Sequence, residues 1–308
     1  MSALFSHIFM AVAVIESMVG LLGNGTILAV SSTSCIRKKI LSSYDMIMIC
    51  LSLSRFFLQS CIMLHLFLSI FFKSLYYEIR VLVIFNAVFM FLNYTSLWFA
   101  AWLSVFYCTK VASFTQSFFI WLKQRISSLM PWILITSTLL SFATSLPFAW
   151  DINNMHNNFT APLTVTNSSE RRDTMKNSLF VVILLCNAGI ALPLLVVVVS
   201  SILLIRSLWI HTRQMQNNAT GFRDPSVEAH VAAIKSVISF LILCVTYFIA
   251  LVLILSRIFL PLSTEVAICI AVMAACLAGH SMILIWSNPK FRARILHYTN
   301  CHVRTRSM

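Results

Sequence analysis

Apolar residues run along most of this chain in long stretches, separated by polar and often basic segments. A helix needs about 20 mostly apolar residues to cross a bilayer. Seven stretches reach that length, at residues 6–33, 45–72, 80–110, 128–149, 178–207, 230–256 and 264–287. The fourth is the least apolar because Thr and Ser interrupt it, but such hydroxyls can bond to their own helix or to a neighbour. The pattern predicts an all-α membrane protein in which residues 1–308 form one seven-transmembrane-helix bundle.

The composition fits a chain whose solvent is largely lipid. Hydrophobic residues make up 59% of the 308 residues and charged residues 10%, whereas a soluble domain carries about 25% charged residues. The N-terminus has no basic segment, and its apolar run continues past residue 30. We therefore expect the first stretch to be retained as a helix rather than cleaved as a signal peptide.

Lys and Arg are distributed unevenly between the segments that join the predicted helices. With the N-terminus outside, 15 of them lie in inner segments and 6 in outer segments, while Arg55 lies within a helix. Inner segments of membrane proteins carry such an excess. The distribution predicts a multi-pass plasma-membrane protein with an extracellular N-terminus and a cytosolic C-terminus. A basic inner face toward anionic lipid also explains the net charge of +13, so nucleic acid is an unnecessary partner.

The segments outside the predicted helices hold few chemical motifs. Residues 151–177 are expected to form an outer loop with glycosylation patterns at Asn158 and Asn167. This loop has no cysteine that could form a disulfide with the third helix, and the spacing of the nine cysteines predicts neither a metal site nor a cofactor. Residues 288–298 alternate basic and apolar side chains, which favours a short amphipathic C-terminal helix over a plain basic tail. Cys301 is either palmitoylated or a plain thiol.

Ionisable side chains inside the predicted helices are costly in a bilayer, so each one calls for a partner. Arg55 and Asn24 are expected at similar depth, and a direct pair between them is favoured over a pair between Arg55 and Glu16. His280 and Ser281 of the last helix can join the same cluster. The cluster is either a switch, whose hydrogen bonds rearrange between two helix packings, or a static contact between helices.

A second polar set lies in the halves of the helices that are expected to face outside. Asn86 and Asn93 are seven residues apart on one face of the third helix, with Phe89 between them. Similar depths on other helices are expected for Asn187, Tyr247 and His65. Together these side chains would line an apolar pocket with a few polar groups, as small-molecule sites do, although each one alone is more often a packing residue.

Short motifs follow one another in a fixed order along the chain. The second and third predicted helices hold Leu51-Ser-Leu-Ser-Arg55 and Leu103-Ser-Val-Phe-Tyr-Cys-Thr-Lys110. The fifth is followed by His211-Thr-Arg-Gln-Met-Gln216, and the seventh holds His280-Ser-Met-Ile-Leu-Ile285. In this order the motifs resemble those of the type 2 (bitter) taste receptors, a family of G-protein-coupled receptors. The D-R-Y and N-P-x-x-Y motifs of rhodopsin-like receptors are absent from the sequence.

The resemblance implies a receptor, not an enzyme, that binds small bitter molecules and activates a heterotrimeric G protein with a gustducin-like Gα and its Gβγ. The family's switch positions correspond to Asn24, Arg55, Phe106, Tyr107, Lys110, His280 and Ser281. Its pocket positions correspond to Phe89, Asn93, Tyr247 and Ile270. Contacts with Gα are expected at Tyr107, Lys110, His211, Met215 and Lys235. Many members have Trp where this chain has Phe89, so the agonists of those members cannot be assumed for it.

A multi-pass small-molecule transporter is the alternative function. Transporter folds tend to show repeated halves and helices broken by Gly or Pro. This chain shows no internal repeat, and it has only 6 Gly and 7 Pro. An intramembrane enzyme would need paired carboxylates, a metal or a nucleophile with its base. The buried carboxylate that the pattern identifies is Glu16, with His65 and His280 at different depths.

Overall fold

The computed structural model describes residues 2–38, 41–76, 78–111, 117–160, 168–218, 225–256, 258–259, 263–289 and 291–294. Seven of the helices in these ranges are long and apolar enough to cross a membrane, which confirms the predicted seven-helix bundle. They are α1 (Ser2–Lys38), α2 (Ser43–Phe71), α4 (Ile79–Val111), α5 (Ser117–Thr160), α6 (Ser168–Asn218), α7 (Pro225–Leu255) and α8 (Thr264–Ser287). A short helix, α3 (Lys73–Tyr76), lies between α2 and α4 along the chain.

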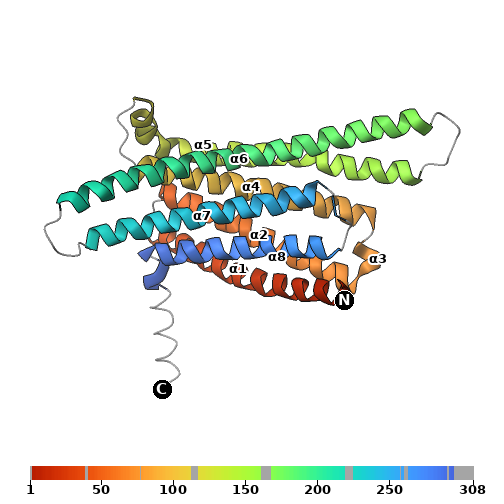
Figure 1. Ribbon diagram of the computed structural model, residues 1–308, viewed down its shortest axis with the longest axis horizontal. Coiled ribbons are helices and arrows are strands. Elements are labelled where there is room, and N and C mark those ends of the chain that lie inside the picture. The colour runs from red at the N-terminus through yellow and green to blue at the C-terminus, as the bar shows by residue number, and fades with distance from the viewer. Residues whose placement is uncertain are drawn as a thin grey trace, which may run out of the picture.

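The seven long helices lie roughly side by side along the long axis of the molecule (Figure 1). α1 packs against α8 and α2, and α4 packs against α5, α6 and α2. α7 completes the bundle between α6 and α8. Ser2 and α3 lie at one end, here called the N-terminal end, and the end of α4 at Val111 lies at the other, called the far end.

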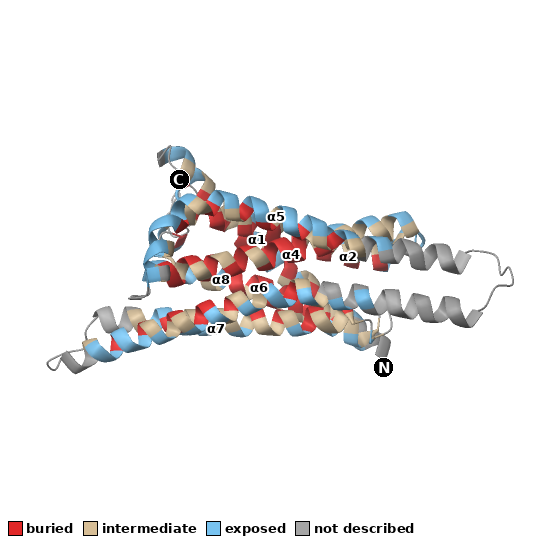
Figure 2. Cartoon of the chain, turned by 90° about the horizontal axis from the view of Figure 1, so that it is seen from above, coloured by how far each residue is buried: buried red, intermediate tan, exposed pale blue. Residues whose placement is uncertain are grey.

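Buried residues concentrate on the inward faces of the helices, and exposed residues cover the outside (Figure 2). Many of the exposed side chains are large and apolar, among them Leu22, Leu139 and Trp286. Water would make such extensive apolar exposure costly, whereas lipid chains solvate it. The outer faces are therefore suited to contact with a bilayer.

Several helices extend beyond the stretches that hydrophobicity predicts, and α5 and α6 do so furthest. α5 begins at Ser117 rather than near residue 128, and its first turns carry Lys123 and Arg125. Long cationic side chains reach the membrane surface along an apolar stem, so a count of apolar residues misses such turns. The predicted outer loop is also partly helical, because α5 continues to Thr160 and α6 starts at Ser168.

The two predicted glycosylation sites fall in this region. Asn158 lies in the last turn of α5, where the structure describes the backbone but not the side chain. Asn167 lies outside the described residues, as does Cys301. The seven cysteines that the structure describes in detail are free thiols.

A helical turn at residues 291–294 follows α8, as expected for the short C-terminal helix. Phe291 is fully buried in a cluster with Ile27 and Val30 of α1. Arg294 donates a hydrogen bond from Nη1 to the carbonyl oxygen of Val30, at 3.0 Å. These contacts hold the turn against α1 at the far end of the bundle.

Candidate ligand site and polar switch

Asn93 of α4 and Tyr247 of α7 meet in the interior of the bundle. The Tyr247 hydroxyl donates a hydrogen bond to Oδ1 of Asn93, and Nδ2 of Asn93 donates to the carbonyl oxygen of Phe89 at 2.7 Å. Asn93 is 0% exposed and Tyr247 5% exposed, so neither group has water as an alternative partner. The described backbones of α4 and α7 do not contact each other. The two side chains therefore form a bridge across the bundle.

A row of aromatic rings extends from this bridge toward the N-terminal end. Phe89, one turn from Asn93, stacks on Phe85 with the ring centroids 6.2 Å apart. Phe85 stacks on His65 of α2 at 5.4 Å, and His65 meets Tyr76 of α3 edge-on at 5.3 Å. The contacts connect two predicted pocket residues, Phe89 and His65, through a third ring. Nδ1 of His65 is buried and has no hydrogen-bond partner among the described residues.

The other predicted pocket residues lie around the same region. Ile270 of α8 packs against the buried apolar cluster that contains Tyr247. Asn86 is half-buried and donates to the carbonyl oxygen of Leu82 in its own helix at 2.8 Å. Asn187 is half-buried on α6. The contacts described here bring Phe89, Asn93 and Tyr247 together, while Asn86, Asn187 and Ile270 are placed less closely.

A second buried polar group centres on Arg55 of α2. Its Nη1 donates to Nδ1 of His280 on α8, and its Nε donates to Oγ of Ser96 on α4 at 3.3 Å. All three residues are at most 4% exposed. A guanidinium group can only donate, so His280 accepts at Nδ1 and is neutral, with its proton on Nε2. The Arg55 cation on α2 is therefore hydrogen-bonded to neutral acceptors on α4 and α8, and this connects the three helices.

The expected pair between Arg55 and Asn24 is wrong. Asn24 of α1 donates from Nδ2 to Oε1 of Gln59 at 3.3 Å and to the carbonyl oxygen of Gly20 at 2.9 Å. Gln59 lies one turn from Arg55 on α2, and its amide occupies the space beside Gly20 that a side chain would fill. Arg55 instead reaches α4 and α8, so the two halves of the predicted cluster have different partners.

Ser281 completes the predicted cluster on the α8 side. It is fully buried, and its Oγ donates to the carbonyl oxygen of Ala278 at 2.7 Å. The same oxygen lies 2.6 Å from the position that a Cβ atom on Gly23 of α1 would take. A glycine at position 23 therefore allows α1 and α8 to approach closely beside the Arg55 group.

Phe240 of α7 connects the two polar groups. Its ring centroid lies 4.6 Å from that of His280, the residue that accepts from Arg55. Phe240 is seven residues before Tyr247 and so lies on the same face, about 10 Å away along the helix. α7 therefore contacts α4 through Tyr247 and the Arg55 group through Phe240.

At the far end, Tyr44 near the start of α2 contacts residues at the ends of α4 and α8. Its hydroxyl oxygen accepts from the Tyr107 hydroxyl at 3.3 Å and from Nδ2 of Asn288 at 2.8 Å. Its ring packs against Phe106 at a centroid distance of 6.4 Å, and Nζ of Lys110 lies 5.7 Å from the Phe106 centroid. Phe106, Tyr107 and Lys110 were predicted as switch residues, whereas Tyr44 was missed.

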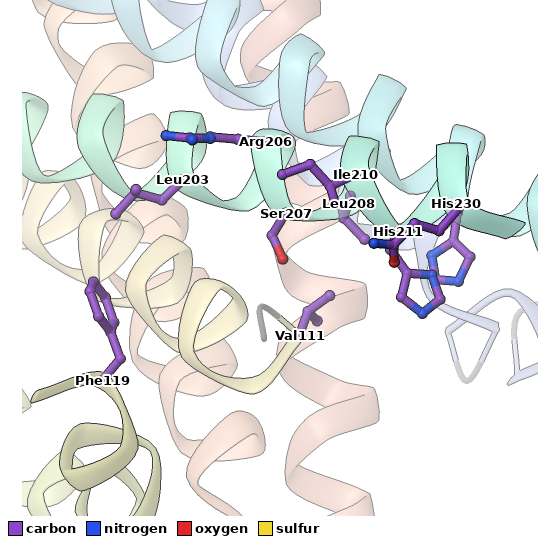
Figure 3. Close-up of a pocket in the computed structure, with 10 residues that line it drawn as sticks. Val111, Phe119, Leu203, Arg206, Ser207, Leu208, Ile210, His211 and His230 are labelled. Carbon is purple, nitrogen blue, oxygen red and sulfur yellow. The ribbon is translucent and has the colours of Figure 1, made fainter. Parts of the chain in front are cut away.

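A cavity of about 610 Å³ opens at the far end and is lined by residues of α4, α5, α6 and α7 (Figure 3). Its apolar lining includes Val111, Phe119 and Leu203. Its polar lining includes Arg206, His211 and His230. The cavity lies well away from the Asn93–Tyr247 bridge, next to residues predicted to contact a G protein.

The five predicted G-protein contacts all lie in the far half of the bundle, on α4, α6 and α7. The exposed ones are Lys110, His211 and Lys235, and the half-buried ones are Tyr107 and Met215. Two of the five are lysines and one is a histidine. Only part of this surface is accessible in the closed packing that the structure shows.

Comparison with known proteins gives a consistent result along the whole chain. A family model described as taste receptor protein (TAS2R) matches residues 1–302. The chain is 67% identical over 309 residues to taste receptor type 2 member 40 of Gallus gallus, covering 99% of each chain. It is 40% identical over 283 residues to member 39 of Papio hamadryas, covering 92% of this chain and 83% of the relative. It is 35% identical over 291 residues to member 2 of Homo sapiens, covering 93% of each.

Proposed function

Because the chain belongs to the type 2 (bitter) taste receptor family of multi-pass G-protein-coupled receptors, we propose that it binds small bitter molecules near Asn93 and Tyr247 and activates a gustducin-type G protein. The N-terminal end of the bundle would face outside the plasma membrane, and the far end would face the cytosol. The bridge between Asn93 and Tyr247 carries the proposal, because a ligand that breaks it acts directly on the packing of α7 against α4.

Ligand recognition would combine stacking with a few hydrogen bonds. An agonist with a hydroxyl or amine group replaces Tyr247 as the donor to Oδ1 of Asn93, and an agonist carbonyl group accepts from Nδ2 of the same amide. Its apolar part stacks on Phe89 and Phe85, and the unpartnered Nδ1 of His65 supplies a further polar contact. Aromatic rings and the apolar cluster around Tyr247 supply most of the contact area, so the site favours apolar or amphipathic ligands.

The signal would travel along α7. When Tyr247 loses Asn93, α7 shifts, and the contact of Phe240 with the ring of His280 changes with it. His280 is an acceptor for Arg55, so the hydrogen bonds that connect α2, α4 and α8 rearrange. A ligand that binds the rearranged packing more tightly than the resting one shifts the population toward it.

At the far end, this change would separate the ends of α6 and α7 and admit the C-terminal helix of Gα. That helix would contact the far ends of α4, α6 and α7 at Tyr107, Lys110, His211, Met215 and Lys235. Rigid-body movement of helices about a packed interface is an established way of amplifying a small change at a ligand site.

The proposal is tested by measuring cytosolic calcium in cells that express the chain with a promiscuous Gα–gustducin chimera, challenged with diverse bitter compounds. We expect a saturable response that requires both proteins, and weaker potency in Asn93→Ala for agonists that hydrogen-bond to the amide. Thr95→Val is the matched control, because Thr95 is also buried but its hydroxyl donates within its own helix, to the carbonyl oxygen of Phe91. Unchanged potency of every agonist in Asn93→Ala, at equal surface expression, removes Asn93 from the ligand site.

The orientation has its own test in the glycosylation patterns. We expect a mobility shift on peptide N-glycosidase treatment that disappears when Asn158 and Asn167 are both changed to Gln. Asn218 lies at the end of α6 in an Asn-Ala-Thr pattern and serves as the control, because it would face the cytosol. Loss of the shift in Asn218→Gln, with the double variant still modified, would reverse the orientation.

A further inference from the structure

Two histidines from neighbouring helices face each other at the far-end cavity. His211 of α6 and His230 of α7 both line this cavity, and their rings lie side by side (Figure 3). The ring centroids are 5.0 Å apart, and the ring planes are inclined by 49°. Within the described part of the chain, neither imidazole makes a hydrogen bond or an ion pair. His211 is exposed and His230 half-buried, so their ring nitrogen atoms are available to an ion that enters from the cavity.

We propose that His211 and His230 form a binding site for a divalent transition metal ion, with Zn²⁺ the ion best suited to it. Neutral imidazole is the commonest metal ligand and suits Zn²⁺, Cu²⁺ and Ni²⁺. With Zn–N bonds of about 2.0–2.1 Å, each ring centroid lies about 3.2 Å from the ion. Centroids 5.0 Å apart then subtend an angle of about 100° at the ion, near the tetrahedral value. The spacing of the rings therefore leaves room for a shared ion when one nitrogen atom of each ring turns toward it.

The remaining ligand positions have candidates in the same cavity. Gln214 also lines it, three residues after His211 and so on the same face of α6. Its amide oxygen and water would complete the tetrahedron. The described residues contain no group of three or more His, Cys, Asp or Glu placed to hold a metal. The site is therefore a two-histidine site, and its affinity depends on both rings.

An ion bound here would join α6 to α7. This consequence rests on the proposed function, in which the far ends of these helices separate to admit Gα. An ion that coordinates both rings binds the closed packing more tightly than the open one, so it shifts the population toward the closed form. Because the agonist site is elsewhere, the ion lowers the maximal response without competing with the agonist.

The site itself is tested by electron paramagnetic resonance of Cu²⁺ bound to the purified full-length receptor in lipid nanodiscs. We expect one Cu²⁺ with couplings from two nitrogen ligands, displaced by Zn²⁺. Its affinity should fall at least about tenfold in His211→Gln and in His230→Gln. His7→Gln, at an exposed position near the N-terminal end, is the matched control and should bind as the wild type does. Equal Cu²⁺ affinity in the wild type and in both site variants would overturn the proposal.

The effect on signalling is measured as agonist-driven nucleotide exchange on a purified G protein, with and without Zn²⁺. His230→Gln is the variant to use, because His211 is itself a proposed contact with Gα. We expect Zn²⁺ to lower the maximal rate of the wild type, a chelator to restore it, and His230→Gln to lose this sensitivity. An agonist response that ignores Zn²⁺ refutes the link between α6 and α7. Absence of any agonist response in metal-free buffer counts against the proposed function instead, while the resonance spectrum still decides the metal site.

Discussion

Tyr247→Phe removes one hydroxyl from the bridge between α7 and α4 and leaves the aromatic ring in place. Oδ1 of Asn93 then loses its donor, and Asn93 is 0% exposed. Leaving a buried acceptor unsatisfied costs about 1–3 kcal/mol, which corresponds to about a 5- to 150-fold change in an equilibrium constant. The account places the bridge in the resting packing only, so this cost falls on the resting state. We therefore expect Tyr247→Phe to raise activity in the absence of agonist.

The assay is agonist-independent signalling, normalised to the amount of receptor at the cell surface and measured over graded expression levels. Basal activity is the preferred readout because Tyr247 can also contact the agonist, which would confuse a measurement of potency. Thr95→Val is again the control, since Thr95 is 4% exposed and its hydroxyl donates within α4 to Phe91 at 2.7 Å. It removes a buried hydroxyl without disconnecting two helices and should behave as the wild type does.

A double-mutant cycle with Asn93→Ala isolates the bridge from other effects of either change. In Asn93→Ala the Tyr247 hydroxyl is itself a buried donor without its acceptor, so removing it as well should raise basal activity less than Tyr247→Phe does in the wild type. The reasoning is refuted if Tyr247→Phe signals no more than Thr95→Val without agonist, or if the two bridge variants are simply additive.

Two further predictions concern stability, measured as the thermal unfolding temperature (Tm) with a dye that reacts with exposed thiols. Gly20→Ala places a Cβ atom where the Gln59 amide lies, so it should lower Tm, at a cost of about 1–3 kcal/mol from overpacking. A Cβ atom on Gly25 would have its nearest neighbour at 3.8 Å, so Gly25→Ala is the control and should not lower Tm. Equal Tm values for the two variants would contradict the close packing of α1 on α2. His280→Phe removes an acceptor from the buried Arg55, so it should lower Tm, at a cost of about 1.5–3 kcal/mol in stability. His280→Gln keeps an acceptor and should lower Tm less. A similar Tm for both variants would show that the hydrogen bond contributes nothing to stability.

The seven-helix architecture was predictable because the bilayer sets both the length and the composition of a spanning helix. The ends of the helices were less predictable. α5 starts at Ser117, through turns that carry Lys123 and Arg125, and α6 starts at Ser168 in a polar segment. Helical structure continues there although the hydrophobic signal has ended, so hydropathy locates the membrane crossing better than it locates the helix.

Within the candidate site, the depth of a residue could be predicted and its partner could not. Position along the chain gives the height of a side chain in the membrane, at about 1.5 Å per residue. Rotation of each helix about its axis depends on packing against all of its neighbours. Asn24 and Arg55 were therefore placed at similar heights, yet Gln59 is the residue that bonds to Asn24. Ser96 and Tyr44 were missed because Ser and Tyr are ordinary packing residues, and neither carries a signal of its own.

The most direct test of the central claim is nucleotide exchange on a purified gustducin-type heterotrimer, driven by the purified receptor in nanodiscs over a range of agonist concentrations. The account predicts saturable, agonist-dependent exchange by the wild type. In Asn93→Ala it predicts a higher basal rate and a smaller agonist-dependent increase, because that variant loses both the resting bridge and the ligand anchor. Exchange that responds to no agonist although the receptor is folded, together with ligand uptake by the same protein in liposomes, would contradict the account and favour a transporter.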